Sequence, residues 1–330
     1  MMRLLVNTVL LLLVHSLRLT EVELMEVSIG KEVLGPDLAM QAALTGTDAA
    51  SASSSVDQTT IQTILAGVER GNRESIYFFG LYKLHGIGLS KNQTIAASNF
   101  LRAADLGHIE AMTAFAVLCM NGRGVEQDYN KAVAYLRKAV GKGDVNAHWF
   151  LGKLLMEGKG VPGGGPQLEE AFQLLSLAAA NNIADAEHLL GILYEYGKGT
   201  QIDFAKAFDM YQRASHQNHV ESTYHMALMH AFGRGVPQNF KLATALFDQG
   251  ARNDHAPSTY YVGIMKLYGY GCEPNYNLAM NWFERAAGMG DERIAKDALA
   301  AAEEVKKMLE LAYKVDEETV AAYHARNSLF

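Results

Sequence analysis

Residues Gly107 to Gly143 read GHIEAMTAFAVLCMNGRGVEQDYNKAVAYLRKAVGKG, and this stretch decides the fold. It contains a helical pattern from Ala111 to Met120, a break at Gly122-x-Gly124, and a second helical pattern from Lys131 to Val140. Two short helices cannot build a hydrophobic core alone, because each leaves an apolar face uncovered. The unit therefore predicts further copies of itself along the chain.

The break recurs at a nearly constant spacing. Its first glycines are Gly86, Gly122, Gly158, Gly197, Gly233 and Gly269, separated by 36, 36, 39, 36 and 36 residues. The longer separation results from the insertion Gly163-Gly164-Gly165 between Pro162 and Pro166, in the turn, where extra length costs little loop-closure entropy. Six copies at this spacing predict a helical repeat array.

Two positions in the first helix of each copy are always small. The first of these positions holds Ser75, Ala111, Ala147, Ala186, Ser222 and Ser258. The second, five residues later, holds Gly80, Ala116, Gly152, Gly191, Ala227 and Gly263, each preceded by a large apolar residue. Glycine inside a helix costs roughly 1 kcal/mol relative to alanine. We therefore interpret the second position as a close contact between two helices.

The second helices repeat as well. Their apolar stripes are expected to start at Ala97, Ala132, Ala171, Ala207, Ala243 and Ala279. Large residues follow three and four positions later, as in Phe100-Leu101 and Trp282-Phe283, and these offsets define one helical face. The Gly-x-Gly break supplies the positive φ angles of a tight reversal. The predicted fold class is all-α: a right-handed αα-hairpin solenoid of six repeats over residues 59–290.

The N-terminal part departs from the repeat. Residues 1–16 carry Arg3, an apolar run from Leu4 to Val14 and the small residue Ser16, the pattern of a cleaved secretory signal peptide. A membrane anchor and an unstructured terminus are the alternatives. Residues 17–58 include an Ala/Ser-rich segment, and we expect them to form a low-complexity, disordered linker.

The C-terminal part also departs from the repeat, because it contains no Gly-x-Gly break. Residues 291–330 are predicted to form C-terminal capping helices that cover the last apolar surface of the array. Asp291 can cap the first of them, from about Ile294 to Tyr313, and a second is expected from Glu317 to Ala325.

Composition narrows the class of function. The formal net charge is −7 and no basic block occurs, which disfavours binding to nucleic acid or to an anionic membrane surface. Cys119 and Cys272 lie four copies apart, so we expect neither a disulfide nor a metal site from them. The four histidines His216, His219, His225 and His230 lack the spacing of a zinc pair. We expect no metal, no cofactor, no small-molecule substrate and no enzymatic activity.

The order Ala-x3-large-Gly/Ala-x5-Gly-x-Gly-Val, followed by Ala-x2-aromatic-x3-Ala-Ala, resembles the Sel-1-like repeat, a relative of the tetratricopeptide repeat. The break matches in full at Gly122-Arg123-Gly124-Val125, Gly158-Lys159-Gly160-Val161 and Gly233-Arg234-Gly235-Val236. The resemblance covers about residues 67–290. It implies a non-enzymatic scaffold or adaptor that binds other proteins, and it specifies the fold better than the function.

Within this family, a chain that enters the endoplasmic reticulum resembles the lumenal adaptor of the Hrd-type ubiquitin ligase. The implied role is to recruit misfolded proteins for ER-associated, ubiquitin-dependent degradation, with ligase subunits and misfolded clients as partners. That adaptor is usually longer and ends in a transmembrane helix, whereas Lys314 to Phe330 is polar. The alternatives are a secreted or surface-associated scaffold and a repeat-type hydrolase, whose paired cysteine spacings this sequence lacks. Pairing into a homodimer is left open.

The sequence suggests two kinds of functional residue, a glycosylation site and candidate residues for partner binding. Asn92-Gln93-Thr94 is a glycosylation sequon in the polar turn of the first copy, which fits a glycoprotein of the endoplasmic reticulum lumen or a secreted one. Two residues after the first small position lie Tyr77, Trp149, His188, Tyr224 and Tyr260. First helices line the concave face of such solenoids, so these side chains are candidates for partner binding. The alternative is that they pack one repeat against the next.

Overall fold

The computed structural model describes the backbone of residues 58–327 and the side chains of residues 58–310. The predicted signal peptide, 1–16, and all but the last residue of the predicted linker, 17–58, lie outside the described residues. The described part is helical throughout. Its helices are α4 Gln58–Glu69, α5 Arg73–His85, α6 Gln93–Asp105, α7 Ile109–Asn121, α8 Tyr129–Val140, α9 Val145–Glu157, α10 Leu168–Ala180, α11 Ala184–Tyr196, α12 Phe204–His216, α13 Val220–Phe232, α14 Phe240–Arg252, α15 Ala256–Tyr268, α16 Tyr276–Ala287 and α17 Glu292–Asn327.

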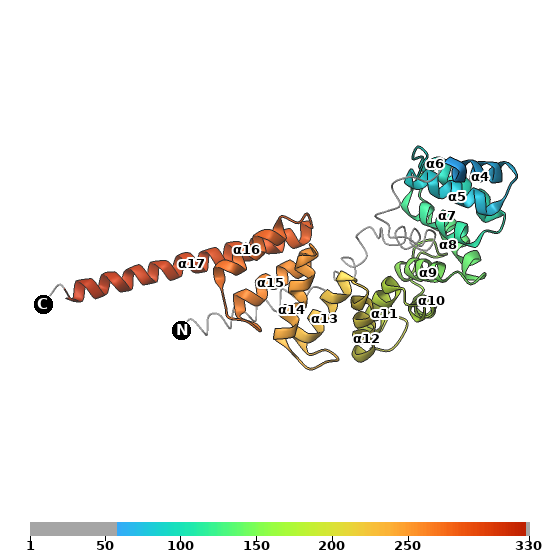
Figure 1. Ribbon diagram of the computed structural model, residues 1–330. Helices are drawn as coiled ribbons and strands as arrows, with labels where there is room; N and C mark the ends of the chain where they lie inside the picture. Colours follow the sequence, from blue (N-terminus) through green and yellow to red (C-terminus); the bar gives the residue numbers. More distant parts are fainter. Residues whose placement is uncertain (1–57, 328–330) are drawn as a thin grey trace.

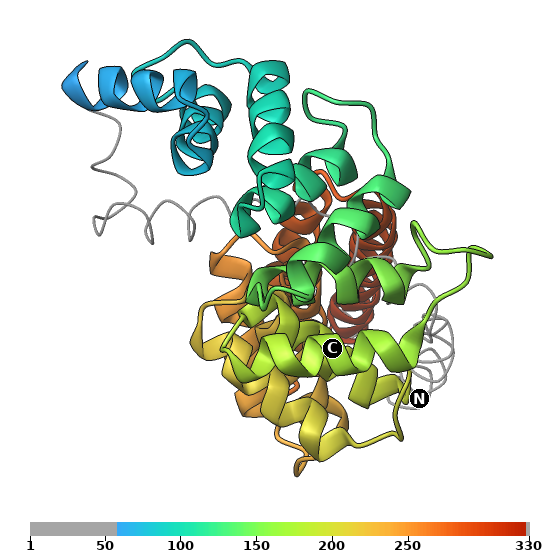
Figure 2. The same cartoon turned by 90° about the vertical axis from the view of Figure 1, so that its right-hand side faces the viewer.

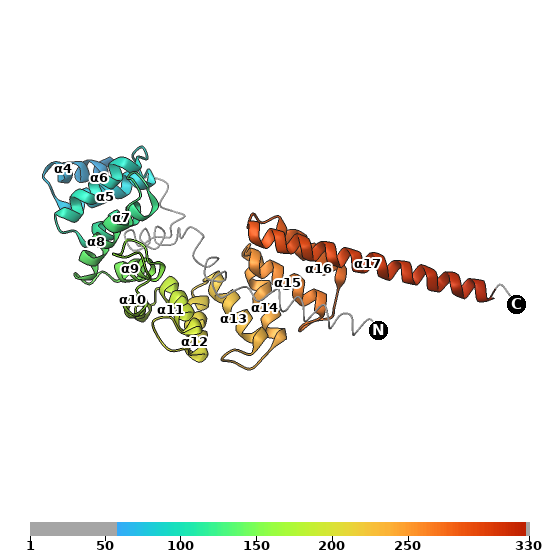
Figure 3. The ribbon, with the colours of Figure 1, turned by 180° about the vertical axis from the view of Figure 1, so that it is seen from behind.

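The helices form consecutive pairs, and each helix packs chiefly against the one before it and the one after it. Six pairs, from α5/α6 to α15/α16, correspond to the six predicted repeats. The pairs follow a curved arc in which α9 and α11 lie on the inner side and α10 and α12 on the outer side (Figures 1 and 3). A view turned by 90° shows that the array winds as it proceeds (Figure 2). The predicted solenoid is confirmed.

Side-chain caps begin most second helices. Asparagine or aspartate accepts a hydrogen bond from the backbone N–H three residues later at Asn92, Asp128, Asp203, Asn239 and Asn275. Each such cap stabilises its helix by about 1 kcal/mol. Gln167, before α10, makes no side-chain cap, and this helix follows the three-glycine insertion.

The first glycine of each break ends a first helix in the left-handed conformation. The φ angles of these six glycines lie between 63° and 77°, and their N–H groups donate to carbonyl groups of the last helical turn. L-residues with a side chain rarely adopt this conformation. The prediction that the break supplies positive φ angles is confirmed.

The second glycine of the break has a further function, because it touches the preceding repeat. A Cβ atom on Gly235 would lie 2.5 Å from the carbonyl oxygen of Phe204, and one on Gly271 would lie 2.5 Å from that of Phe240. Phe204 and Phe240 are the first residues of α12 and α14. The same approach to the first residue of a second helix recurs at Gly124, Gly160 and Gly199. The break therefore sets the distance between repeats.

The small residue inside each first helix faces the second helix of the same repeat. A Cβ atom on Gly191 would lie 2.6 Å from the ring of Tyr211, and one on Gly263 would lie 2.6 Å from the ring of Phe283. The predicted close contact between helices is confirmed. The large residues that fill this position are fully buried throughout the array: Phe100, Leu136, Leu175, Tyr211, Phe247 and Phe283.

The register of the first copy needs a correction. The carbonyl oxygen of Ala96 lies against Gly80 in the same way that the carbonyl of Ala171 lies against Gly152, at 3.4 Å from an added Cβ in both cases. The apolar stripe of α6 therefore starts at Ala96, and the expected start at Ala97 was wrong by one residue. Both alanines are buried, so composition alone did not separate them.

The C-terminal cap is one helix. Asp291 accepts a hydrogen bond from the N–H of Ile294, as predicted, and α17 then runs without interruption to Asn327. The prediction of a separate helix from Glu317 was wrong, because no glycine or proline interrupts the helical sequence. Ile294, Ala298, Ala302 and Val305 are buried beside the last repeat, and the helix then extends past α16 (Figure 1).

Within residues 58–327 none of the helices combines the length and the apolar character that crossing a lipid bilayer requires.

Substituting alanine for the second glycine of a break tests its role in spacing the repeats. Gly235→Ala adds left-handed strain at φ 70° and a clash with the backbone at Phe204. We expect it to lower the free energy of unfolding by about 2–6 kcal/mol, from roughly 1–3 kcal/mol for each effect. Chemical denaturation followed by circular dichroism measures the change.

Gly165→Ala is the matched control, because nothing lies within 4 Å of an added Cβ there and φ is not positive. We expect a change within about 0.5 kcal/mol. Equal effects of the two substitutions would show that the break does not set the spacing.

Candidate protein-interaction surface

The inner side of the arc can be located from the helical geometry. In each first helix the small residue, such as Gly191 or Gly263, faces the second helix. The residue five positions later lies about 140° around the helix axis and is therefore turned away from the second helix. This residue immediately precedes each Gly-x-Gly break. The six residues are His85, Asn121, Glu157, Tyr196, Phe232 and Tyr268.

These six residues change in character along the array. All are at least partly exposed. In the first three repeats they are polar or charged, and in the last three they are aromatic, with Phe232 55% exposed. At this position the inner face is thus polar in the first three repeats and aromatic in the last three.

In the last three breaks the middle residue contacts the residue that precedes the break. Lys198 Nζ lies 5.9 Å from the centre of the Tyr196 ring, and the Arg234 guanidinium lies 5.5 Å from that of Phe232. The rings of Tyr268 and Tyr270 are 5.7 Å apart. We call this set the inner aromatic strip: Tyr196, Lys198, Phe232, Arg234, Tyr268 and Tyr270. Exposed aromatic and arginine side chains of this kind are enriched at protein interfaces.

The aromatic residues that the sequence singled out lie elsewhere. Tyr77, Trp149, His188, Tyr224 and Tyr260 are buried, with exposed fractions between 2% and 8%. Three of them contact the residue that caps the first helix of the next repeat, stacked in the first two pairs and edge-on in the third. Ring centres are 4.3 Å apart for Tyr77 and His108, 4.5 Å for His188 and His219, and 5.2 Å for Tyr224 and His255. This placement supports packing between repeats, because buried side chains offer little surface to a partner.

Sequence reasoning missed the inner aromatic strip, although a signal was present. The residue before each Gly-x-Gly break is aromatic in three consecutive copies, at Tyr196, Phe232 and Tyr268. The predicted binding residues belong to another series, two residues after the first small position. Which of the two series faces the inside depends on how the repeats curve, and the sequence pattern does not show this.

A buried polar cluster lies between the fourth and fifth repeats, behind the strip. Glu195 accepts a hydrogen bond from the Tyr211 hydroxyl at 2.7 Å, and its carboxylate lies 3.5 Å from His225 Nδ1. Arg234 Nη1 lies 3.6 Å from the same carboxylate. Burial alone would raise the pKa of Glu195, but the hydrogen bonds from His225 and Tyr211 and the charge of Arg234 lower it. The cluster anchors Arg234 at the inner face.

His188 belongs to the same repeat interface. Its Nδ1 lies 3.0 Å from the Ser222 hydroxyl, and its ring contacts His219 and His225. Burial, followed by the nearby histidines, holds the pKa of His188 well below its ordinary value of 6.5. The imidazole is therefore neutral in the folded protein at neutral pH.

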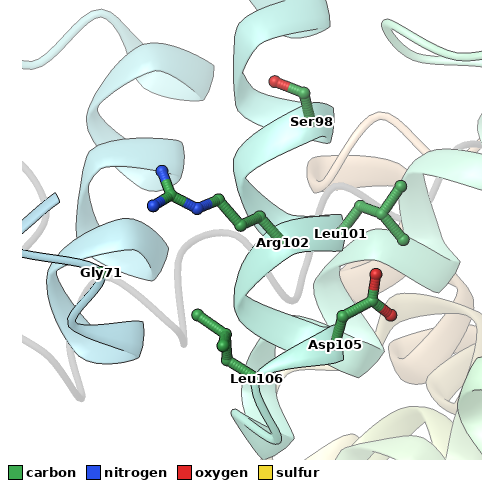
Figure 4. Close-up of a pocket in the computed structure, with 6 residues that line it drawn as sticks. All are labelled: Gly71, Ser98, Leu101, Arg102, Asp105 and Leu106. Carbon is green, nitrogen blue, oxygen red and sulfur yellow. The ribbon is translucent and has the colours of Figure 1, made fainter. Parts of the chain in front are cut away.

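A shallow pocket on α6 belongs to the contact between repeats. It has a volume of about 410 Å³ and is lined by Gly71, Ser98, Leu101, Arg102, Asp105 and Leu106 (Figure 4). Arg102 extends toward the turn at Gly71, and its Nη2 donates to the carbonyl of Val68 at 3.4 Å. Arg213 and Arg285 make the same contact with Ala179 and Ala251, at 2.8 and 3.0 Å. Arg102 is thus one of a series of side chains that tie adjacent repeats together.

The remaining polar candidates are dispersed. Cys119 is buried and Cys272 is partly buried, and both are free thiols. His216 is exposed, whereas His230 contacts the edge of the Phe208 ring. In the part of the chain that the structure describes, no three histidine, cysteine, aspartate or glutamate side chains are grouped so that they could hold a metal ion.

Comparison with known proteins agrees with this geometry. The Sel1 repeat family model matches residues 73–108, 109–144, 145–183, 184–219, 220–255 and 256–291. The crystal structure of c5321, a protective antigen of uropathogenic Escherichia coli strains with an SLR fold, is 27% identical, with a TM-score of 0.64 over 78% of this chain and 56% of that chain. A Sel1 repeat protein from Oxalobacter formigenes is 25% identical, with a TM-score of 0.59 over 66% of this chain and 85% of that chain. No curated protein matches the sequence.

The curved array of helical pairs and its exposed inner face define the class as a solenoid scaffold for protein interactions. The six matches extend from residue 73 to residue 291, well over half of the chain. The chain belongs to the Sel1 repeat family. It spans little more than half the length of c5321.

Alanine substitution separates packing residues from surface residues. We expect Trp149→Ala to lower the free energy of unfolding by about 3–5 kcal/mol, because the ring is buried in the core. Phe232→Ala removes a ring that is largely exposed, so it should change the free energy of unfolding by less than about 1 kcal/mol. Urea unfolding of both variants measures the difference. A Trp149→Ala protein as stable as the parent would contradict the packing role.

The low pKa of His188 predicts a pH-dependent stability. Its stabilising contribution is complete above the unfolded pKa, near 6.5, and is lost as the pH falls below it, because the unfolded chain then binds a proton that the folded protein excludes. We expect the melting temperature to fall between about pH 7.5 and about pH 5.5. This pH range lies above the range in which protonation of Glu195, whose pKa is lowered, would change the stability.

His188→Tyr is the matched variant, because tyrosine occupies the equivalent positions Tyr77, Tyr224 and Tyr260. It should flatten the dependence of the melting temperature on pH over the same range. An unchanged slope in this variant would show that His188 is not the source of the pH dependence.

Proposed function

We propose that this protein is a scaffold of the secretory pathway that holds other proteins on its inner face. Two features support the proposal: the inner aromatic strip, where Phe232 is exposed and Tyr196 and Tyr268 are partly exposed, and the position of the sequon at Asn92. The strip offers the aromatic and cationic side chains that anchor protein partners.

The geometry of Asn92 supports the proposed location in the secretory pathway. Asn92 is exposed and caps α6, and its Oδ1 accepts a hydrogen bond from the N–H of Ile95 at 2.9 Å. A glycan is attached through Nδ2, the other end of the amide, so the cap and the glycan are compatible. The predicted signal peptide would bring this exposed sequon into the compartment where such glycans are added.

Within the secretory pathway, the proposed role is that of an adaptor in ER-associated degradation. The array would hold misfolded proteins and subunits of a ubiquitin ligase at the same time, in the endoplasmic reticulum lumen. The resemblance to the lumenal adaptor of the Hrd-type ligase supports this role. An elongated array with separate surfaces suits it, because two partners can bind to different repeats.

A second candidate is a secreted or surface-associated scaffold. The specific observation in its favour is the similarity to c5321, which is described as a protective antigen. The two candidates differ in where the protein accumulates, so one experiment separates them.

The glycan on Asn92 tests the proposal. When the full chain is expressed in eukaryotic cells, we expect a glycan that endoglycosidase H removes from cell-retained protein. Thr94→Ala should abolish the glycan by removing the sequon and leave the Asn92 cap in place. Electrophoretic mobility before and after digestion is the readout.

Asn92→Asp is the control for folding, because it removes the acceptor amide and keeps a capping oxygen. A resistant glycan on protein in the medium would favour the secreted candidate. Unmodified cytosolic protein would contradict both secretory candidates.

A further inference from the structure

A row of acidic side chains lies along one edge of the inner face. Each residue before a Gly-x-Gly break faces the inside, and the residue 11 positions earlier lies about 20° away around the same helix and about 17 Å along its axis. That earlier position, at the start of the first helix, therefore also faces the inside. It is acidic in four of the six repeats, and we call this set the acidic row: Glu74, Glu110, Asp185 and Glu221.

The acidic row distinguishes the first helices from the second helices. Its four side chains are between 30% and 64% exposed. An acidic residue in the first turn stabilises any helix, because it interacts favourably with the helix dipole. The second helices have the same dipole, yet five of the six carry no acidic residue in their first turn, with α10 as the exception. The acidic row therefore marks the helices that line the inner face.

A row of cations lies along the opposite edge of the inner face. The middle residue of the break is basic in four consecutive repeats, and we call this set the basic row: Arg123, Lys159, Lys198 and Arg234. Three of these cations contact the inward-facing residue that precedes the break. Lys159 Nζ lies 2.8 Å from Glu157 Oε2, and the cations of the next two repeats lie over aromatic rings. The basic row is thus a concentration of positive charge on a chain whose net charge is −7.

The basic row keeps hydrogen-bond donors for a partner. The carboxylates nearest to Lys159 and Arg234 belong to Glu157 and Glu195, whose side chains are only 7% and 5% exposed, whereas the two cations are 44% and 49% exposed. Arg234 Nη1 lies 3.6 Å from Glu195, which is too far for a hydrogen bond. An ammonium group has three donors and a guanidinium group has five. Both cations can therefore also bind an acidic group that approaches from the inner side.

The surface between the two rows is mostly apolar. Residues four and seven positions before the one that precedes the break lie on the inner side of each first helix, between the rows. In the second to fifth repeats Lys153 and His225 are the polar residues at these positions. The others form what we call the apolar band: Ala114, Val117, Phe150, Leu189, Ile192 and Leu228. Three members of the band, Ala114, Val117 and Leu228, are partly exposed.

The two rows and the apolar band match an amphipathic helix. An α-helix with its side chains is about 10–12 Å wide, so it fits between rows that lie about 17 Å apart. Its apolar face would lie on the band, and each of its flanks would meet a row of opposite charge. An extended strand occupies only about 4.8 Å and does not fill this width. A nucleic acid is disfavoured, because the acidic row repels its phosphates.

Resting on the scaffold function proposed above, we propose that the inner face of the second to fifth repeats binds an amphipathic α-helix of a partner protein. The acidic flank of that helix faces the basic row, and its basic flank faces the acidic row. A helix turned end for end exchanges its flanks. The two rows therefore also fix the direction in which the partner helix runs along the array.

Fluorescence anisotropy with the purified full chain tests the inference. The probe is a fluorescein-labelled peptide of about 25 residues, long enough to form a helix in water, with leucine on one face, glutamate along one flank and lysine along the other. The comparison peptide has the same composition, with glutamate and lysine alternating on both flanks, and circular dichroism checks that the two have equal helix content. We expect the first peptide to bind about tenfold more tightly at low salt, and this ratio to approach one at about 1 M salt, where charges are screened within about 3 Å.

Glu110→Gln combined with Arg123→Gln removes one member of each row from the second repeat and leaves the net charge unchanged. We expect this double variant to reduce the ratio of affinities to about threefold, and the further changes Asp185→Asn and Lys198→Gln to abolish it. Asp248→Asn combined with Arg252→Gln is the matched control and should keep the ratio. These two residues lie on α14, a second helix, with side chains 38% and 80% exposed. Thermal unfolding followed by circular dichroism shows whether each variant is folded.

A parent protein that binds neither peptide, or that binds both equally, would overturn the inference. So would a folded variant with all four changes that still discriminates. If that variant does not fold, the double variant decides, and an unchanged ratio in it would overturn the inference. The assay uses no cells, so its outcome is independent of the glycan experiment. A protein that discriminates in solution but remains cytosolic would contradict the secretory proposal alone.

Discussion

The structure depends on the absence of a side chain at the second glycine of each Gly-x-Gly break. At Gly235 the backbone lies directly against the first residue of α12, in the preceding repeat, with no room for a Cβ atom. The same contact at every junction from Gly124 to Gly271 gives the repeats a constant spacing. The repeats stacked at this spacing form a curved arc, and the curvature decides which side of each first helix is open to a partner.

The close spacing of the helices also explains why each core contact pairs a small residue with a large one. A glycine or alanine on the first helix faces a large buried residue on the second, as Gly191 faces Tyr211. Between repeats, a ring such as His188 stacks on the cap of the next first helix, His219. The fourth and fifth repeats add a buried Glu195, whose partners include an arginine of the inner face. Arg234 therefore takes part both in the packing between repeats and in the inner aromatic strip.

The spacing of the glycines allowed the fold to be predicted from sequence, because a glycine break has one physical explanation and recurs six times. The cap at Asp291 was also predicted, because aspartate directly before a helical pattern is a common N-cap. Contacts that depend on how the repeats curve could not be predicted from the sequence. Tyr224 and Phe232 look equally suited to binding in the sequence, and only the arrangement of the repeats shows that the first is buried and the second is open.

The continuous helix α17 extends the array at its C-terminal end. A helix of 36 residues is roughly 54 Å long, and its buried residues from Ile294 to Val305 pack beside the last repeat. Val305 is the last buried residue among the described side chains, and the helix continues for another 22 residues, or roughly 33 Å, to Asn327. One element thus closes the last repeat with its first turns and extends the molecule beyond the array with its remaining length (Figure 1).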